Sequence, residues 1–164
     1  MLSTLPAVSK EHHERLMWNV DHLPMLGDRI GTVPLVDLSP EVDEAATFLT
    51  VLLLPHMDAT ERSLYPELER LLQNRHSMTP MRREHAEIRR LVDDLVHIQK
   101  DLAAGKLPTG EAMALRRVIF RLYALLKIHL AEEQLYVGML DHAVSTEVAE
   151  ALALALEHGG FEHA

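Results

Sequence analysis

The chain contains no cysteine among its 164 residues. Disulfide bonds, thiolate catalysis, cysteine-bound zinc and iron–sulfur clusters are therefore excluded, so a metal site has to use histidine, carboxylate or tyrosine ligands. Glycine is sparse at seven residues and aromatic residues make up only 4%, whereas alanine, leucine, glutamate and arginine recur throughout. This composition favours helices over strands.

Basic residues are outnumbered by acidic ones, which gives a formal net charge of −9. We therefore expect no broad affinity for nucleic acid or for anionic lipid. The longest apolar run, FLTVLLLP, is far shorter than the ~20 residues that span a bilayer. The first residues also lack the pattern of a signal peptide. A cytoplasmic protein without a membrane partner is expected.

Caps and apolar periodicity predict four long helices. Ser39 before Pro40, and Thr79 before Pro80, have the pattern of an N-cap followed by proline at the first helical position. Pro55 and Pro66 lie inside the second helix, where each removes one backbone donor, so kinks are expected there. The predicted helices cover about residues 7–26, 39–73, 80–104 and 112–141, with a shorter tail helix over 146–157.

Four long helices joined by short links predict an all-α, up-down-up-down four-helix bundle. We assign this bundle to residues 1–144. The C-terminal helical tail, residues 145–164, is expected to pack on the bundle or to help form a homodimer, and a monomer is the alternative.

The second and fourth helices each carry a histidine on an apolar face. Leu122 and Leu126 precede His129 by seven and three residues, so all three side chains share one side of the helix. Glu133 follows one turn later at the i,i+4 spacing, which places its carboxylate beside the imidazole. His56 likewise follows a run of leucines. Both histidines are therefore predicted to point into the bundle.

The first and third helices repeat a common pattern. Apolar residues follow His13 at offsets of three, seven and ten, and the same offsets recur after His85. His12 is the competitor to His13, but only His13 reproduces the offsets seen from His85. The chain thus offers one inward histidine on each of its four long helices.

Several inward imidazoles with carboxylates predict a metal site. A buried unpaired carboxylate is costly and normally finds a cation. The number of ligands exceeds what one tetrahedral zinc ion uses and suits a pair of iron or manganese ions bridged by carboxylates and an oxygen. The competing interpretation is a metal-free bundle with buried histidine networks. The histidines interpreted as having no role in the site are His22, His76, His97, His142, His158 and His163.

The chain resembles the hemerythrin-like family, also called the HHE cation-binding domain. The resemblance rests on the segments EHHERL, HMDATERSLYPEL, MRREHAEIRRLV and HLAEEQLY, in this order. It implies a four-helix bundle that holds two iron ions joined by an oxo or hydroxo bridge, with iron favoured over manganese. The positions that match the family pattern of histidine, H-x-x-x-E, histidine and H-x-x-x-E are His13, His56, His85, His129 and Glu133.

One position departs from that pattern. Thr60 stands where the family has its first bridging glutamate, and Glu61 is displaced by one residue. A five-residue step turns about 140° beyond one full helical turn, so Glu61 points further from the His56 face. The expected kinks and the length of the side chain could still bring Glu61 to the metal, and we include it among the predicted ligands. Asn19, six residues after His13, is either a hydrogen-bond donor behind the ligands or an edge residue.

The predicted function is a diiron protein that binds or detoxifies a small oxidant, namely dioxygen, nitric oxide or hydrogen peroxide. Catalase-like or nitric-oxide-consuming turnover is left open, because spacing does not reveal an open coordination position or a proton source. Tyr123 and Tyr136, on the helix of His129, are weak candidates for that proton source or for an unusual ligand. The alternatives are an iron-dependent sensor or interaction module with a structural metal site, and a bundle that lost one metal through Thr60.

Overall fold

The computed structural model describes residues 5–106 and 110–159. All regular secondary structure in these two ranges is helical, apart from one isolated bridge between Ile30 and Val33. The all-α prediction is confirmed. The helices that stand alone are α1 (Leu5–Arg29), α5 (Thr79–Ala103), α6 (Glu111–Asp141) and α7 (Thr146–Gly159), with a short 3₁₀ turn η1 (Leu35–Leu38) after α1.

The two predicted N-caps are wrong by one residue. Ser39 and Thr79 are already helical, and the capping positions are Leu38 and Met78, neither of which makes a side-chain capping hydrogen bond. A proline stands at the start of each helix. Since proline has no amide hydrogen, each helix start has one fewer donor for a cap to satisfy.

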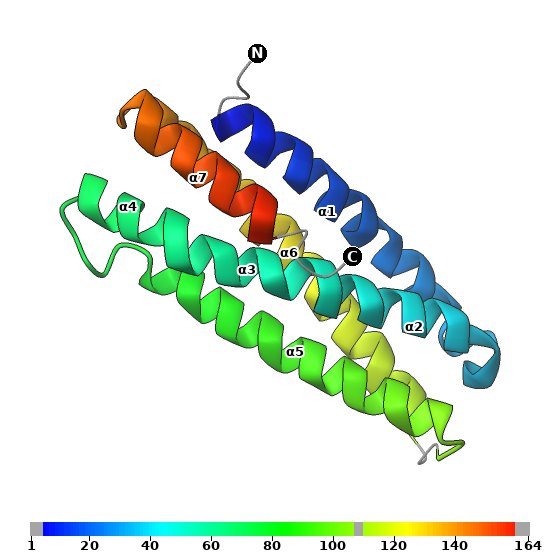
Figure 1. The fold of residues 1–164 in the computed structure, drawn as a ribbon. Coiled ribbons are helices and arrows are strands. Elements are labelled where there is room, and N and C mark those ends of the chain that lie inside the picture. The colour runs from blue at the N-terminus through cyan, green and yellow to red at the C-terminus, as the bar shows by residue number, and fades with distance from the viewer. Residues whose placement is uncertain (1–4, 107–109, 160–164) are drawn as a thin grey trace.

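The predicted second helix is a single rod built from alternating α and π segments (Figure 1). Its parts are α2 (Ser39–Thr47), η2 (Phe48–Leu53), α3 (Leu54–Ala59), η3 (Thr60–Leu64) and α4 (Tyr65–Leu71). Each π segment ends just before the dipeptide that contains a proline, Pro55 or Pro66. Proline cannot donate to the helical ladder, and its ring crowds the carbonyl one turn earlier, so the hydrogen bonds there widen locally. The expected distortions therefore take the form of π turns.

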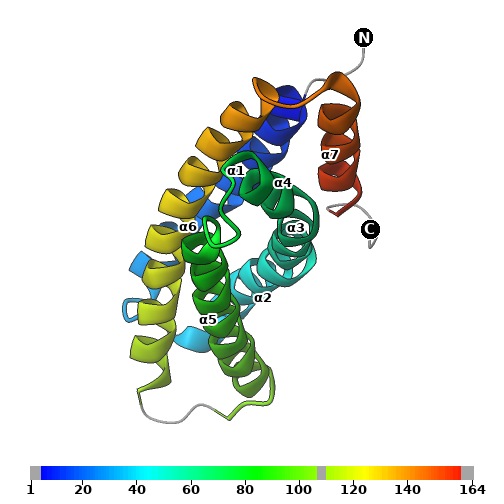
Figure 2. The ribbon, with the colours of Figure 1, turned by 90° about the vertical axis from the view of Figure 1, so that its left-hand side faces the viewer.

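Neighbouring helices run antiparallel, as ion pairs and hydrogen bonds along their length show. In α1 and α6 the residue numbers of the contacts run in opposite directions, and the same holds for the rod and α5 (Figures 1 and 2). The contacts are Asp21 with Lys127 and Asp28 with Arg116 in the first pair, and Asp43 with Gln99 and Asp58 with Arg89 in the second.

The apolar interior consists of two clusters. The larger one fills the space between α1, the first half of the rod, α5 and α6. The smaller one gathers around Tyr65 and is closed by Leu152, Ala153 and Leu156 of α7. In sequence, His85 lies between Met81 of the small cluster and the first α5 residue of the large one. The inward histidines therefore lie where the two clusters meet.

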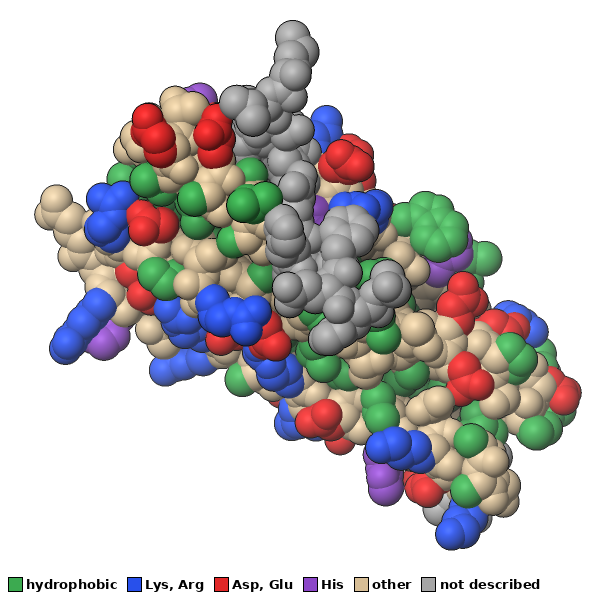
Figure 3. Space-filling model, in the orientation of Figure 1, with side chains coloured by type: hydrophobic (Ala, Val, Ile, Leu, Met, Phe, Trp, Pro, Cys, Tyr) green, Lys and Arg blue, Asp and Glu red, His purple; other side chains and the backbone are tan. Residues whose placement is uncertain are grey.

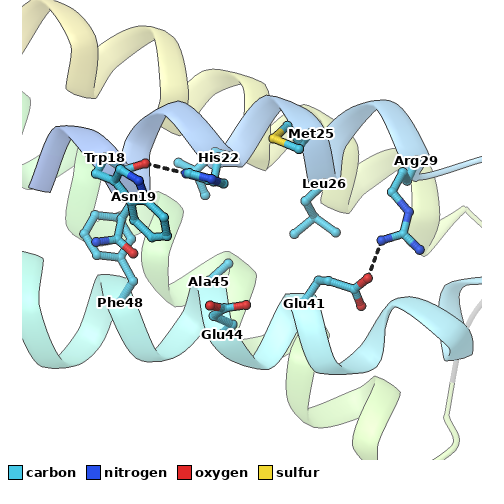
Figure 4. Close-up of a pocket in the computed structure, with 11 residues that line it drawn as sticks. Trp18, Asn19, His22, Met25, Leu26, Arg29, Glu41, Glu44, Ala45 and Phe48 are labelled. Carbon is cyan, nitrogen blue, oxygen red and sulfur yellow. Dashed lines mark hydrogen bonds and ion pairs between the residues drawn. The ribbon is translucent and has the colours of Figure 1, made fainter. Parts of the chain in front are cut away.

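The surface has no strong separation of charge on the side drawn in Figure 3, where acidic and basic side chains are interspersed. A shallow groove with a cavity volume of about 200 Å³ lies between α1 and α2, lined by the exposed Trp18 and by Phe48 (Figure 4). An ion pair between Arg29 and Glu41 closes one end of it. Among the described helices, none combines the length and the apolar content that crossing a membrane requires.

Candidate metal centre

Four helices each bring one buried histidine to a common centre. His56, His85 and His129 are at most 1% exposed, as is Glu133, and His13 is 7% exposed. Their apolar neighbours on each helix are buried too, so the amphipathic pattern alone turns these side chains inward. Burial of this many titratable groups in one place requires compensating charge or hydrogen bonds.

Glu133 is the carboxylate at the middle of the cluster. Its Oε1 lies 3.1 Å from Nε2 of His13 and 3.1 Å from Nε2 of His56. Its Oε2 lies 3.4 Å from Nε2 of His129. The two oxygens therefore face different histidines, which is the arrangement of a bridging carboxylate.

The ligand atoms form two groups, and Glu133 belongs to both. One group is His13, His56 and Glu133, and the other is His85, His129 and Glu133. Within each group the candidate ligand atoms lie within 4.8 Å of one another. The structure thus brings together five of the six predicted ligands in two adjacent groups, each of which could hold a metal ion, with Glu133 common to both.

Carboxylates outside the centre determine which nitrogen of each ring faces inward. Nδ1 of His85 lies 2.6 Å from Glu61, and Nδ1 of His129 lies 2.8 Å from Glu84. An ionised carboxylate only accepts hydrogen bonds, so both Nδ1 atoms carry a proton. In the neutral rings the two Nε2 atoms then hold lone pairs, and these atoms lie only 2.9 Å apart. Lone pairs at this distance require a cation, either a proton or a metal ion.

Buried polar atoms of His56 and Glu133 also lack hydrogen-bond partners, which indicates that a cation is required here too. Among the described residues, both ring nitrogens of His56 and Oε2 of Glu133 are buried without a hydrogen-bond partner. Nε2 of His56 is close to Glu133 but is not aligned for a hydrogen bond. Buried polar atoms are almost always hydrogen-bonded in folded proteins. The residues present therefore fit a metal centre, in which Nε2 of His56 and Oε2 of Glu133 would be ligand atoms.

Burial and mutual charge set the protonation of the cluster. Burial would raise the pKa of Glu133, but the charge of His56, the close ring of His129 and a hydrogen bond with His13 hold its pKa well below the usual range. Burial lowers the pKa of His85 to about 4. Burial also lowers the pKa of His56, against the charge of Glu133. The pKa of His129 is raised, because the hydrogen bonds and charges of Glu133 and Glu84 outweigh its burial. A divalent cation binds the ionised carboxylate and the neutral imidazoles, so it would displace the proton of His129.

A sequence model of the family described as the hemerythrin HHE cation-binding domain matches residues 6–140. The chain belongs to this family. The match covers all four histidine helices and stops at the end of α6, before α7 begins. Searches among curated proteins and among solved structures find no match. Family membership supports cation binding by the cluster described above.

Thr60 and Glu61 are the residues at which this chain departs from the family pattern. Thr60 is fully buried, and its hydroxyl donates to the carbonyl of Met57 at 3.0 Å, so it does not replace a carboxylate. Glu61 does not join either ligand group. Its carboxylate lies behind the ring of His85, on Nδ1, and also accepts from Arg89 at 3.0 Å. The turn of about 140° beyond one full helical turn directs Glu61 toward α5 and away from the shared centre.

Tyr65 and Glu84 are site residues that sequence reasoning missed. The side chain of Tyr65 is fully buried, and its hydroxyl lies 3.0 Å from Nε2 of His85, the ring nitrogen that also faces His129. Nine residues after His56, an ideal helix would place Tyr65 on the opposite face. In the π turn of η3 the helical hydrogen bonds span five residues, so Thr60 and Tyr65, which are five residues apart, both point inward. Pro66 is the only sequence signal of that turn.

Other predicted or doubtful residues are not members of the two ligand groups. Asn19 lines the groove between α1 and α2 and donates to the carbonyl of Arg15. His12 is buried with its ring centroid 4.7 Å from that of His56, but it is in neither ligand group. Tyr123 and Tyr136 are half-buried and pack on the large and the small apolar cluster. His22, His76, His97 and His142 are exposed, and His158 and His163 lie outside the residues whose side chains are described.

We expect the metal-free protein to lose stability as the pH falls from about 6.5 to about 4. Burial lowers the pKa of His12 to about 3 and that of His85 to about 4. In this range the unfolded chain binds more protons than the folded chain, so the free energy of unfolding decreases with falling pH. The pKa of His129 is raised, because Glu133 and Glu84 outweigh its burial, so this residue gains a proton in the folded state and opposes the loss of stability. It is one group, whereas the pKa values of His12, His56 and His85 are all lowered. Urea unfolding of chelator-treated protein across this range measures the effect, and a constant midpoint would contradict it.

Proposed function

We propose that the protein is a non-heme diiron protein that binds or consumes a small oxidant, namely dioxygen, nitric oxide or hydrogen peroxide. The observation that carries the proposal is the pair of ligand groups that share Glu133. Two histidines and a shared carboxylate at each position match the nitrogen and oxygen donors that iron accepts in proteins. The four long helices would form an up-down-up-down bundle, in which such centres are built from facing side chains.

The roles of the residues follow from their positions. His13 and His56 would hold one iron, His85 and His129 the other, and Glu133 would bridge them. Glu61 and Glu84 would hold the rings of the second pair in the tautomer that presents Nε2 to the metal. When bound, the iron pair would supply the electron transfer that no side chain of this chain provides.

Two features of the chain support reactivity at the centre. Thr60 leaves one carboxylate fewer than the family pattern, so the iron pair would keep a coordination position for an external ligand. Tyr65 can donate a hydrogen bond to a ligand there, because burial raises its pKa above the usual range and keeps the phenol protonated. Apolar side chains from both clusters surround the site and would exclude larger substrates.

Metal content combined with peroxide consumption tests the proposal. Iron-loaded protein should contain two irons per chain, and oxygen release on addition of hydrogen peroxide would identify a catalase-like activity. Two irons without peroxide consumption but with reversible binding of dioxygen or nitric oxide would identify a carrier or sensor. One or no metal ion after careful iron loading under reducing conditions would overturn the diiron proposal.

Removing Glu61 should weaken the second metal position without destroying it. In the Glu61→Ala variant the ring of His85 loses the acceptor on Nδ1, and loss of such a partner typically costs about 10- to 100-fold in metal affinity. Competition with a chelator measures this change. Asp58→Ala is the matched control, since Asp58 contacts the same Arg89 but not the histidine. An equal loss in both variants would show that the effect comes from Arg89 and not from the ring.

A further inference from the structure

The outer side of α6 is an exposed apolar surface. Ile128, Leu135 and Met139 are 57%, 72% and 45% exposed, and Ala124 and Ala131 between them are exposed as well. Figure 2 shows that α6 lies along one edge of the molecule. Contiguous apolar surface of this kind commonly marks an interaction site.

The exposed residues follow a second repeat that the core does not use. The buried stripe of α6 contains the ligands His129 and Glu133, whereas the outer residues alternate in steps of four and three. That spacing is the heptad seam of a pair of packed helices. The seam consists of Arg117, Arg121, Ala124, Ile128, Ala131, Leu135, Gly138 and His142.

Gly138 provides an independent reason to expect a partner. A glycine inside a helix destabilises that helix relative to alanine. In the described structure a Cβ at Gly138 would meet no atom within 4 Å, so the chain itself does not require a glycine there. A partner that approaches the backbone closely would require one.

The charges of α6 favour an antiparallel partner with the same sequence. Residues 111–127 contain four basic side chains and one acidic one, and residues 128–141 contain three acidic side chains and no basic one. Asp141 is in the last turn, where the helix dipole disfavours a negative charge and where no basic residue offsets it. Antiparallel pairing of two α6 helices brings each basic half against an acidic half, whereas parallel pairing opposes like charges.

We propose that the outer face of α6 binds a second copy of this chain, antiparallel and about a twofold axis. In the register that aligns the two seams, Ile128 lies opposite Ala131, Leu135 lies opposite Ala124, and Arg121 lies opposite Gly138. Each large side chain then meets a small one, and the twofold axis repeats every contact. Arg117 lies opposite His142 in the same register, beside Asp141.

Mass measurement by light scattering tests the surface. The wild-type protein should have twice the mass of one chain, and Leu135→Glu should have the mass of one chain. Helical content and iron loading should not change, because Leu135 is on the surface and is not a ligand. Met25→Glu, on an equally exposed methionine of α1, is the control that should stay dimeric. A monomeric wild type, or a Leu135→Glu variant that stays dimeric, would overturn the proposal.

The absence of native cysteine allows a direct test of the register. Ala124→Cys and Leu135→Cys, each oxidised alone, should give little disulfide-linked dimer, because identical residues lie far apart in an antiparallel pair. An oxidised mixture of the two variants should give the mixed dimer. Efficient cross-linking of Ala124→Cys to itself would show a parallel or different interface and contradict the proposed one.

Discussion

Replacing Glu133 with alanine should abolish binding of both metal ions. Glu133 is the one residue common to the two ligand groups, and its carboxylate is the negative charge that the surrounding imidazoles face. Without it, each position keeps two histidines and loses the shared oxygen donor. We expect iron content to fall from two per chain to near zero, as measured by elemental analysis after loading.

Matched variants separate this effect from a general loss of folding. His142→Ala changes an exposed histidine one residue beyond α6 and should keep full iron content. His129→Ala should abolish iron loading as well, because it removes a nitrogen donor and opens the centre. Glu133→Gln is nearly isosteric and should retain the helical circular dichroism of the wild type while losing metal. Equal iron content in Glu133→Gln and His142→Ala would refute the shared-carboxylate assignment.

Replacing Tyr65 with phenylalanine should reduce peroxide consumption by about 100-fold while iron content stays near two per chain. The hydroxyl that is lost is the donor beside Nε2 of His85, and removal of one positioned hydrogen-bond donor typically reduces turnover by a factor of about this order. The variant keeps the aromatic ring, which packs inside the small apolar cluster. Steady-state oxygen release and elemental analysis of the same preparation measure both quantities.

Tyr136→Phe is the control for the role of Tyr65. Tyr136 packs on the same cluster and is half-buried, but it lies outside the ligand groups. Its replacement should leave peroxide consumption unchanged. If Tyr136→Phe and Tyr65→Phe reduce turnover equally, the hydroxyl of Tyr65 is not a catalytic hydrogen-bond donor and the effect comes from packing. If the iron-loaded wild type consumes no peroxide, the same comparison applies to the affinity for nitric oxide.

Most of the helical structure and five of the predicted ligands could be derived from local pattern. The series of leucines before His129 and the matched offsets after His13 and His85 specify which side of each helix is apolar. A helix that must bury one stripe turns any polar residue in that stripe inward as well. The positions of these histidines therefore depend on periodicity that a single helix already contains.

The caps and the rod show where local pattern was insufficient. Ser39 and Thr79 have the side chains of N-caps, but the chain enters each helix one residue earlier. Pro55 and Pro66 were expected to kink the helix, and the structure accommodates each proline with a π turn in the residues that precede it. A π turn shifts the phase of every residue that follows it, so a helical wheel drawn through Tyr65 assigns this residue to the wrong face.

The sequence by itself determined an all-helical chain with one inward histidine per long helix and a glutamate one turn after His129, because these features depend on spacing within one helix. Only the tertiary structure decided that Glu61 supports the ring of His85, that Thr60 contributes no carboxylate, and that Tyr65 reaches the centre. These outcomes depend on the local phase of a distorted helix and on which side chains of α5 and α6 meet it. Such contacts are made between segments far apart in sequence, where periodicity carries no information.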